Sequence, residues 1–217
     1  LSYSYGQELP DSFTSLNKVT RLTLEGFHDV SCLADFPNLV YLHVNGGNLS
    51  KFSAVACMHN LQELRVSGGY NLGSVAVLKE LQNLQKVNFS QTNTAADTEN
   101  LFMIPNLREL NINDTEFTID LNLVERNESL QVLYMENLKW SAYNTVEGDR
   151  KYNYDNWEKL PMGECIDFLE NFPNLRVLSI RGDKVDSLEF AGSLSKLELL
   201  DITDNYISDI SVLNSLP

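Results

Sequence analysis

The 217-residue sequence holds few of the residues that catalytic and metal sites use most often. Its three histidines and three cysteines form neither an H-x-x-x-H nor a C-x-x-C spacing. The chain also lacks the G-x-S-x-G and G-x-x-x-x-G-K-[ST] motifs of hydrolases and phosphate-binding proteins. Carboxylates are common throughout, so no pair stands out as a general acid and base. We therefore expect no catalytic residues, no cofactor and no metal.

Positive charge and long apolar runs are scarce as well. The chain has 16 Lys and Arg against 30 Asp and Glu, a net charge of −14. Proteins bind nucleic acids and anionic membranes through Lys and Arg, so we expect neither as a partner. No apolar run approaches the roughly 20 residues of a membrane-spanning helix, so membrane insertion is not expected either.

What the sequence does have is a repeat. The spacing L-x-x-L-x-L, with other aliphatic residues allowed, recurs at steps of 20, 22, 23, 23, 23, 45 and 22 residues. A fixed period in the low twenties predicts a stack of similar small units, and the long step equals one unit plus about 22 residues. The spacing starts at Val19, Leu39, Leu61, Leu84, Leu107, Leu130, Leu175 and Leu197.

Each unit is predicted to contain a strand and a helical return. Leu110 and Ile112 alternate, which places both on one face of a short strand. In the second half of a unit apolar residues recur at every third position, as in Phe52, Val55 and Met58, which is typical of one face of a helical or 3₁₀ segment. Stacked units would bury both rows in one continuous core.

Asparagine occupies the position before most of the starts. Because Asn side chains bond nearby backbone groups in turns, this column predicts a structural corner and not a binding site. Its members are Asn38, Asn60, Asn83, Asn106 and Asn174, with Ser129 and Lys196 as exceptions.

The last unit, from Leu197 through Asn205 to Leu216, combines L-x-x-L-x-L with I-x-x-L-x-x-L. This pattern resembles the leucine-rich repeats of the phosphatase regulator SDS22 and of the bacterial internalins, over about residues 19–217. The resemblance implies an α/β solenoid: a right-handed curved stack with a parallel sheet on its concave face and short helical or 3₁₀ returns on its convex face. Where that family usually has the Asn seen at Asn205, the earlier units have other residues, so we expect less regular turns after their strands. These residues are Phe27, Gly47, Gly69, Thr92, Thr115, Leu138 and Asp183.

The domain organisation expected is one solenoid. Residues 1–18 would form an N-terminal cover or a partial repeat, and residues 19–217 an array of eight units. The array stops inside a unit without a legible polar cap, which suggests a fragment of a longer protein. The long step contains an aromatic-rich insertion at about residues 139–160.

By the same resemblance, the residues beside each inward pair would face the concave side. Tyr41, His43 and Arg65 form one cluster there. Tyr134 lies beside Val132 and Val177, with Leu199 further along. Exposed aromatic residues and Arg are typical of protein interfaces. Val and Tyr also favour strands for their own sake, so the alternative of ordinary strand composition stays open.

The insertion supplies the remaining candidates, which are aromatic. Long loops in compact domains are commonly functional or disordered, and so many aromatic rings argue against disorder. The rings could contact a partner or pack the loop onto its own scaffold, and both interpretations stay open. The residues are Trp140, Tyr143, Tyr152, Tyr154 and Trp157.

These observations favour a non-catalytic, monomeric binding module for a protein ligand, with a glycan as the second choice. By resemblance to internalins, we expect it at a bacterial cell surface or secreted. One alternative is an intracellular, cytoplasmic scaffold like SDS22. Another is the recognition part of a larger enzyme.

Overall fold

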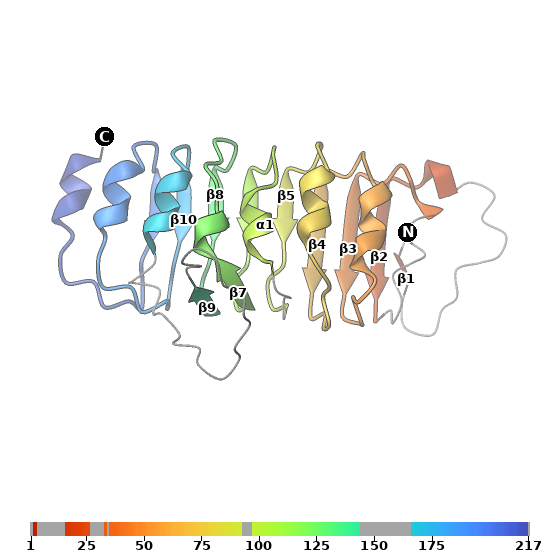
Figure 1. The fold of residues 1–217 in the computed structure, drawn as a ribbon, viewed down its shortest axis with the longest axis horizontal. Coiled ribbons are helices and arrows are strands. Elements are labelled where there is room, and N and C mark those ends of the chain that lie inside the picture. The colour runs from red at the N-terminus through yellow and green to blue at the C-terminus, as the bar shows by residue number, and fades with distance from the viewer. Residues whose placement is uncertain are drawn as a thin grey trace.

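The computed structural model describes residues 2–3, 16–26, 33, 35–92, 97–143 and 166–216. A nine-stranded parallel sheet runs through them in the order β1-β2-β3-β4-β5-β6-β8-β10-β11. Figure 1 shows the units side by side in one row from the N-terminal to the C-terminal part. The strands are β1 (Ser2–Tyr3), β2 (Arg21–Glu25), β3 (Tyr41–Asn45), β4 (Glu63–Ser67), β5 (Lys86–Asn88), β6 (Glu109–Asn111), β8 (Val132–Tyr134), β10 (Val177–Ser179) and β11 (Leu199–Asp201).

Short helical segments return the chain along one face of this sheet (Figure 1). Most are 3₁₀ turns, as the every-third-residue spacing predicts, because side chains at i and i+3 eclipse in that geometry. The opposite face of the sheet is called the open face below. The returns are η1 (Leu16–Lys18), η3 (Phe52–Cys57), η4 (Ala76–Glu80), α1 (Glu99–Phe102), η5 (Leu121–Leu123), η7 (Ile166–Asn171), η8 (Glu189–Ser193) and η9 (Ser211–Ser215).

The strands pair in the register of the repeat. Leu64 lies opposite Val87, Val87 opposite Leu110, Leu110 opposite Leu133, and Leu133 opposite Leu178. The last of these steps crosses 45 residues of sequence and the others 23, yet the alignment is the same. The predicted file of neighbouring parallel rungs is confirmed.

The core consists of the two predicted apolar rows. Burial of one such side chain stabilises a fold by about 1.5–3 kcal/mol, so the rows together hold neighbouring units in contact. In the last described unit Leu200 and Ile202 are only partly buried. The inward strand pairs that are at most 1% exposed are Leu22/Leu24, Leu42/Val44, Leu64/Val66, Val87/Phe89, Leu110/Ile112, Leu133/Met135 and Leu178/Ile180.

The Asn column is a structural corner, as predicted. Asn83 Nδ2 donates to the His59 carbonyl at 2.7 Å, and Asn106 Nδ2 donates to the Gln82 carbonyl at 2.8 Å. Ser129, an exception in sequence, makes the same kind of bond through its hydroxyl, to the Pro105 carbonyl at 2.7 Å.

The turns after the strands share one backbone feature in all eight units. One residue there has a left-handed φ between 54° and 75°, a conformation that glycine adopts without strain. This position is therefore regular, whereas further left-handed residues, at Gly47, Asn71, Asp97 and Lys184, occur in only some units. Thr92 and Thr115 also fill the usual Asn position, since their hydroxyls donate to the carbonyls of Val66 and Phe89, both at 3.1 Å. The left-handed residues are Gly26, Gly46, Gly68, Gln91, Asp114, Asn137, Gly182 and Asp204.

A second, two-stranded sheet was not anticipated from the sequence. Strand β7 (Glu116–Asp120) pairs in parallel with β9 (Lys139–Tyr143), and Glu116 lies opposite Lys139. That offset of 23 residues is the repeat step, so residues 139–143 keep the period although they were assigned to the insertion. Alternating Phe117 and Ile119 were the available signal for β7.

Next to this sheet, a polar residue interrupts the apolar row of the returns. Asn127 is 8% exposed, and its Nδ2 donates to the carbonyls of Phe102 and Ile104 at 2.9 and 3.1 Å. The rings of Phe102 and Phe172, which belong to returns on either side of η5, stack with centroids 5.5 Å apart. Phe168 packs edge-on against both. The Asn127 N–H also donates to the Asn171 carbonyl at 2.9 Å, next to Phe172, so this residue is tied to the returns on both sides.

Candidate binding surface

The N-terminal cluster lies on the open face, as predicted. Tyr41 and His43 are on β3, and Arg65 on β4 lies directly opposite His43. Strand alternation explains their position, because Leu42, Val44 and their neighbours point into the core and the residues between them must point away.

The polar groups of this cluster already have partners within the chain. The Arg21 guanidinium lies 4.1 Å from the Tyr41 ring centre, and Arg65 Nε lies 2.7 Å from Glu63 Oε1. The His43 ring nitrogen Nε2 lies 3.4 Å from Ser67 Oγ. Burial, and secondly the Arg65 charge, lower the pKa of His43 below its usual value, so the imidazole is neutral at pH 7.

The C-terminal part of the open face is different in character. Val132, Val177 and Leu199 lie opposite one another on the adjacent strands β8, β10 and β11. Leu199 is 51% exposed, which is unusual for a leucine on a strand face. Tyr134 lies one position along on the same face, opposite Ser179. These four residues, Val132, Tyr134, Val177 and Leu199, form an apolar row.

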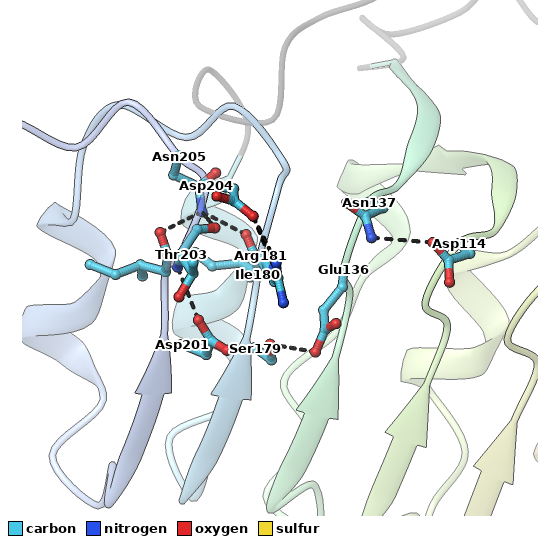
Figure 2. A network of polar contacts seen from close by, with 11 residues as sticks. Asp114, Glu136, Asn137, Ser179, Ile180, Arg181, Asp201, Thr203, Asp204 and Asn205 are labelled. Atoms are coloured by element: carbon cyan, nitrogen blue, oxygen red, sulfur yellow. Dashed lines mark hydrogen bonds and ion pairs between the residues drawn. The ribbon is translucent and has the colours of Figure 1, made fainter.

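Acidic side chains border the apolar row at the carboxyl ends of the strands (Figure 2). Glu136 Oε1 accepts a hydrogen bond from Ser179 Oγ at 2.7 Å, which buries the serine. Hydrogen bonds from Thr203 lower the pKa of Asp201 and keep it ionised. The Arg181 charge is directed to Asp204, 3.0 Å away. The border therefore carries an excess of negative charge.

In the last unit, the oxygen-bearing side chains between Asp201 and Asp209 form hydrogen bonds with nearby backbone groups. Asp201 Oδ1 accepts from the Thr203 N–H at 2.9 Å, and Asp209 Oδ1 accepts from the Ser211 N–H at 2.8 Å at the start of η9. Asn205 Nδ2 donates to the Ile180 carbonyl at 2.8 Å. Over the described ranges, no three His, Cys, Asp or Glu side chains converge as metal ligands would.

The aromatic candidates of 139–160 are not on the open face where the structure describes them. Trp140 and Tyr143 belong to β9, opposite Phe117 and Asp120 in the second sheet. Tyr152, Tyr154 and Trp157 lie outside the described residues. The structure therefore brings Tyr41, His43 and Arg65 together and places Tyr134 apart, four strands along from β3 in the order β3-β4-β5-β6-β8.

No family model matches the chain, and no curated protein matches its sequence. Solved structures do match it. An internalin, inlF from Listeria monocytogenes, is 22% identical with a TM-score of 0.58, over 92% of this chain and 58% of that one. The chain therefore has a leucine-rich repeat fold. The chain thus spans a little over half the length of that internalin.

Other solved leucine-rich repeat structures give similar agreement. Internalin C2 of L. monocytogenes is 20% identical with a TM-score of 0.62, over 86% of this chain and 72% of that one. Mouse RP105, solved in complex with MD-1, is 18% identical with a TM-score of 0.57, over 94% of this chain and 38% of that one. These likenesses establish the solenoid, while the SDS22-like subclass remains a prediction. In the described residues, no helix is long and apolar enough to cross a bilayer.

Proposed function

We propose that this leucine-rich repeat array is a non-catalytic module that binds a protein ligand through the C-terminal part of its open face. The single observation that carries the proposal is the apolar row Val132, Tyr134, Val177 and Leu199, held in register on three neighbouring strands. A side chain such as Leu199, 51% exposed on a rigid strand, is the kind of contact that interface hot spots bury.

The N-terminal cluster supports the same assignment more weakly. Tyr41, His43 and Arg65 are brought together, but Arg21 covers the Tyr41 ring and Glu63 holds Arg65. A ligand would have to displace these contacts, whereas the apolar row offers uncharged surface directly. We therefore place the centre of the interface between β8 and β11 and treat the N-terminal cluster as its far end.

The solved neighbours agree with a protein ligand, since RP105 was crystallised with MD-1 and a plant receptor ectodomain from Arabidopsis thaliana with CASPARIAN STRIP INTEGRITY FACTOR 2. That ectodomain is 14% identical with a TM-score of 0.56, over 96% of this chain and 27% of that one. By likeness to the internalins we propose a bacterial surface or secreted location and a monomeric state. A full-length reading frame with an export signal or surface anchor would support this location, and one lacking both would favour the cytoplasmic scaffold.

The binding test uses a matched pair of leucines. Peptides selected from a random 12-residue display library on the immobilised protein serve as the probe. Leu199→Asp should weaken the best selected peptide at least 10-fold, because a charge replaces an apolar contact at the centre of the row. Leu123→Asp, at a leucine 43% exposed on η5, should change the affinity less than 2-fold. Isothermal titration calorimetry measures both.

The result has to be separated from unfolding. Both variants should keep the melting temperature of the parent chain, since neither leucine is in the core. Tyr134→Ala should weaken the same peptide as Leu199→Asp does. If Leu123→Asp abolishes binding and Leu199→Asp does not, the interface lies on the returns and the proposal fails. Changing Trp140 and Tyr143 to Ala in the same assay tests whether β9 takes part.

A further inference from the structure

The position eight residues after each repeat start, just past the strand, carries a hydrogen-bond donor in three of the described units. Thr92 and Thr115 donate a hydroxyl, and Asn205 donates its amide to the Ile180 carbonyl. Each donor reaches the second inward residue of the preceding unit, 25 or 26 residues earlier. In the unit of β10 the same position is Asp183, whose ionised carboxylate has no hydrogen to donate.

Asp183 is buried and only half satisfied. It is 6% exposed, and its Oδ1 accepts from the Leu138 N–H at 2.8 Å. Its Oδ2 is fully buried without a hydrogen-bond partner in the described structure. An unpaired buried oxygen is costly, and much more so when it is charged. A proton on Oδ2 removes the charge and creates a hydrogen-bond donor, as this position has in the Thr115 hydroxyl and the Asn205 amide.

In the described turns around Asp183, no cation relieves this burial. Glu136, from the turn after β8, acts on Asp183 as a like charge. On its own turn Arg181 is paired with Asp204, and Lys184 is exposed. From the next unit the charged groups are Asp201 and Asp204. Burial, with a smaller contribution from Glu136 and against the bond from Leu138, raises the pKa of Asp183 to about 7.

We propose that Asp183 is a proton-dependent joint between two units: with a proton on Oδ2 the turn after β10 closes on the turn at Leu138, and loss of that proton to solvent loosens the junction from which β9 begins. The proposal concerns the fold and does not depend on the proposed ligand. The proposed pH dependence is specific to this unit, because the equivalent residues of the neighbouring units, Leu138 and Asn205, have no titratable side chain.

The direction of the pH effect follows from the two pKa values. Asp183 titrates near 3.8 when unfolded and near 7 when folded. Between these values the folded chain keeps a proton that the unfolded chain has lost, so stability falls as pH rises from about 4 to about 7 and then levels. The full separation corresponds to roughly a 1,000-fold change in the ratio of folded to unfolded protein.

The test compares the whole chain with Asp183→Asn, which resembles the protonated acid. Urea unfolding is followed at pH 5, 6, 7 and 8. From pH 5 to pH 8 the folded-to-unfolded ratio of the parent chain should fall at least 10-fold. The fold-change of this ratio in D183N over the same range should be at least 10 times smaller. Glu99, with a pKa raised by burial, and His43, with a pKa lowered by burial, contribute slopes of opposite sign to both proteins, and these cancel in the comparison.

Two measurements address the joint itself. Hydrogen exchange at the Leu138 amide, corrected for intrinsic rate, should quicken from pH 6 to pH 8 in the parent chain and stay constant in D183N. Carboxyl ¹³C NMR of the parent chain should show Asp183 titrating near 7, which needs no variant to fold. Titration near 3.8, or Leu138 exchange with the same pH dependence in both proteins, would overturn the proposal.

Discussion

Replacing Phe172 with alanine will lower the free energy of unfolding by about 3–5 kcal/mol. The ring is fully buried and stacks on Phe102 at 5.5 Å, with Phe168 edge-on at 6.0 Å. Phe102 and Phe172 come from returns on either side of η5, so loss of the Phe172 ring leaves a cavity between them. The backbone around Asn127 is bonded in place and cannot collapse to fill it. Urea unfolding followed by circular dichroism measures the effect.

Leu123→Ala is the matched control for that cavity. Leu123 is an apolar residue of the same region, in η5, but it is 43% exposed. Its truncation should change the free energy of unfolding by no more than about 0.5 kcal/mol. A cost for Phe172→Ala below about 1 kcal/mol would mean that neighbouring returns close readily over the gap. The three rings would then not be the element that holds these units together.

Replacing Asn127 with leucine should cost about 2–4 kcal/mol. The repeat pattern alone predicts the opposite, because the other returns place apolar or small residues in this row and leucine would restore it. In the structure Asn127 Nδ2 donates to two buried carbonyls, of Phe102 and Ile104, and its Oδ1 accepts from the Ser129 N–H at 2.8 Å. Leucine makes none of these bonds, so two buried carbonyls and the Ser129 N–H lose their side-chain partner.

An exposed asparagine of the corner column separates amide loss from packing. Asn60 donates to the Asn38 side chain at 3.2 Å, and both are exposed, so Asn60→Leu should cost no more than about 0.5 kcal/mol. Thermal unfolding of both variants at one pH gives the comparison. An Asn127→Leu protein as stable as the parent chain would show that the repeat pattern, and not the hydrogen bonds, decides this position.

The regular spacing of apolar residues correctly predicted the features of the fold that burial determines. Pairs such as Leu110 and Ile112 are where the sequence places them, because a period of two on a strand leaves one choice of inward face. The corner asparagines were predictable for a similar reason, since a side chain at one fixed offset meets the corner of the preceding unit, in most cases at a backbone carbonyl. The candidate residues Tyr41, His43 and Arg65 follow from the same alternation.

The sequence could not reveal contacts that break the period. Asn127 and Asp183 are single departures, and whether a buried polar residue is satisfied depends on backbone groups more than 20 residues away, a carbonyl for Asn127 and an N–H for Asp183. Strand β9 keeps the period, but its aromatic composition led us to assign it to the insertion. The hydrogen bonds of Thr92 and Thr115 to backbone carbonyls were not predicted. The family pattern has an Asn amide at their position, and residue type alone does not identify a threonine hydroxyl as its equivalent.

The alignment of β10 on β8 has a practical meaning for protein engineers. Val177 on β10 pairs with Val132 on β8 across 45 residues, in the same alignment that Val132 has with Glu109 on β6 across 23 residues. The sheet therefore tolerates a longer connection at this boundary. A change in the number of residues between Tyr143 and Ile166 should therefore leave the pairing of β10 with β8 intact.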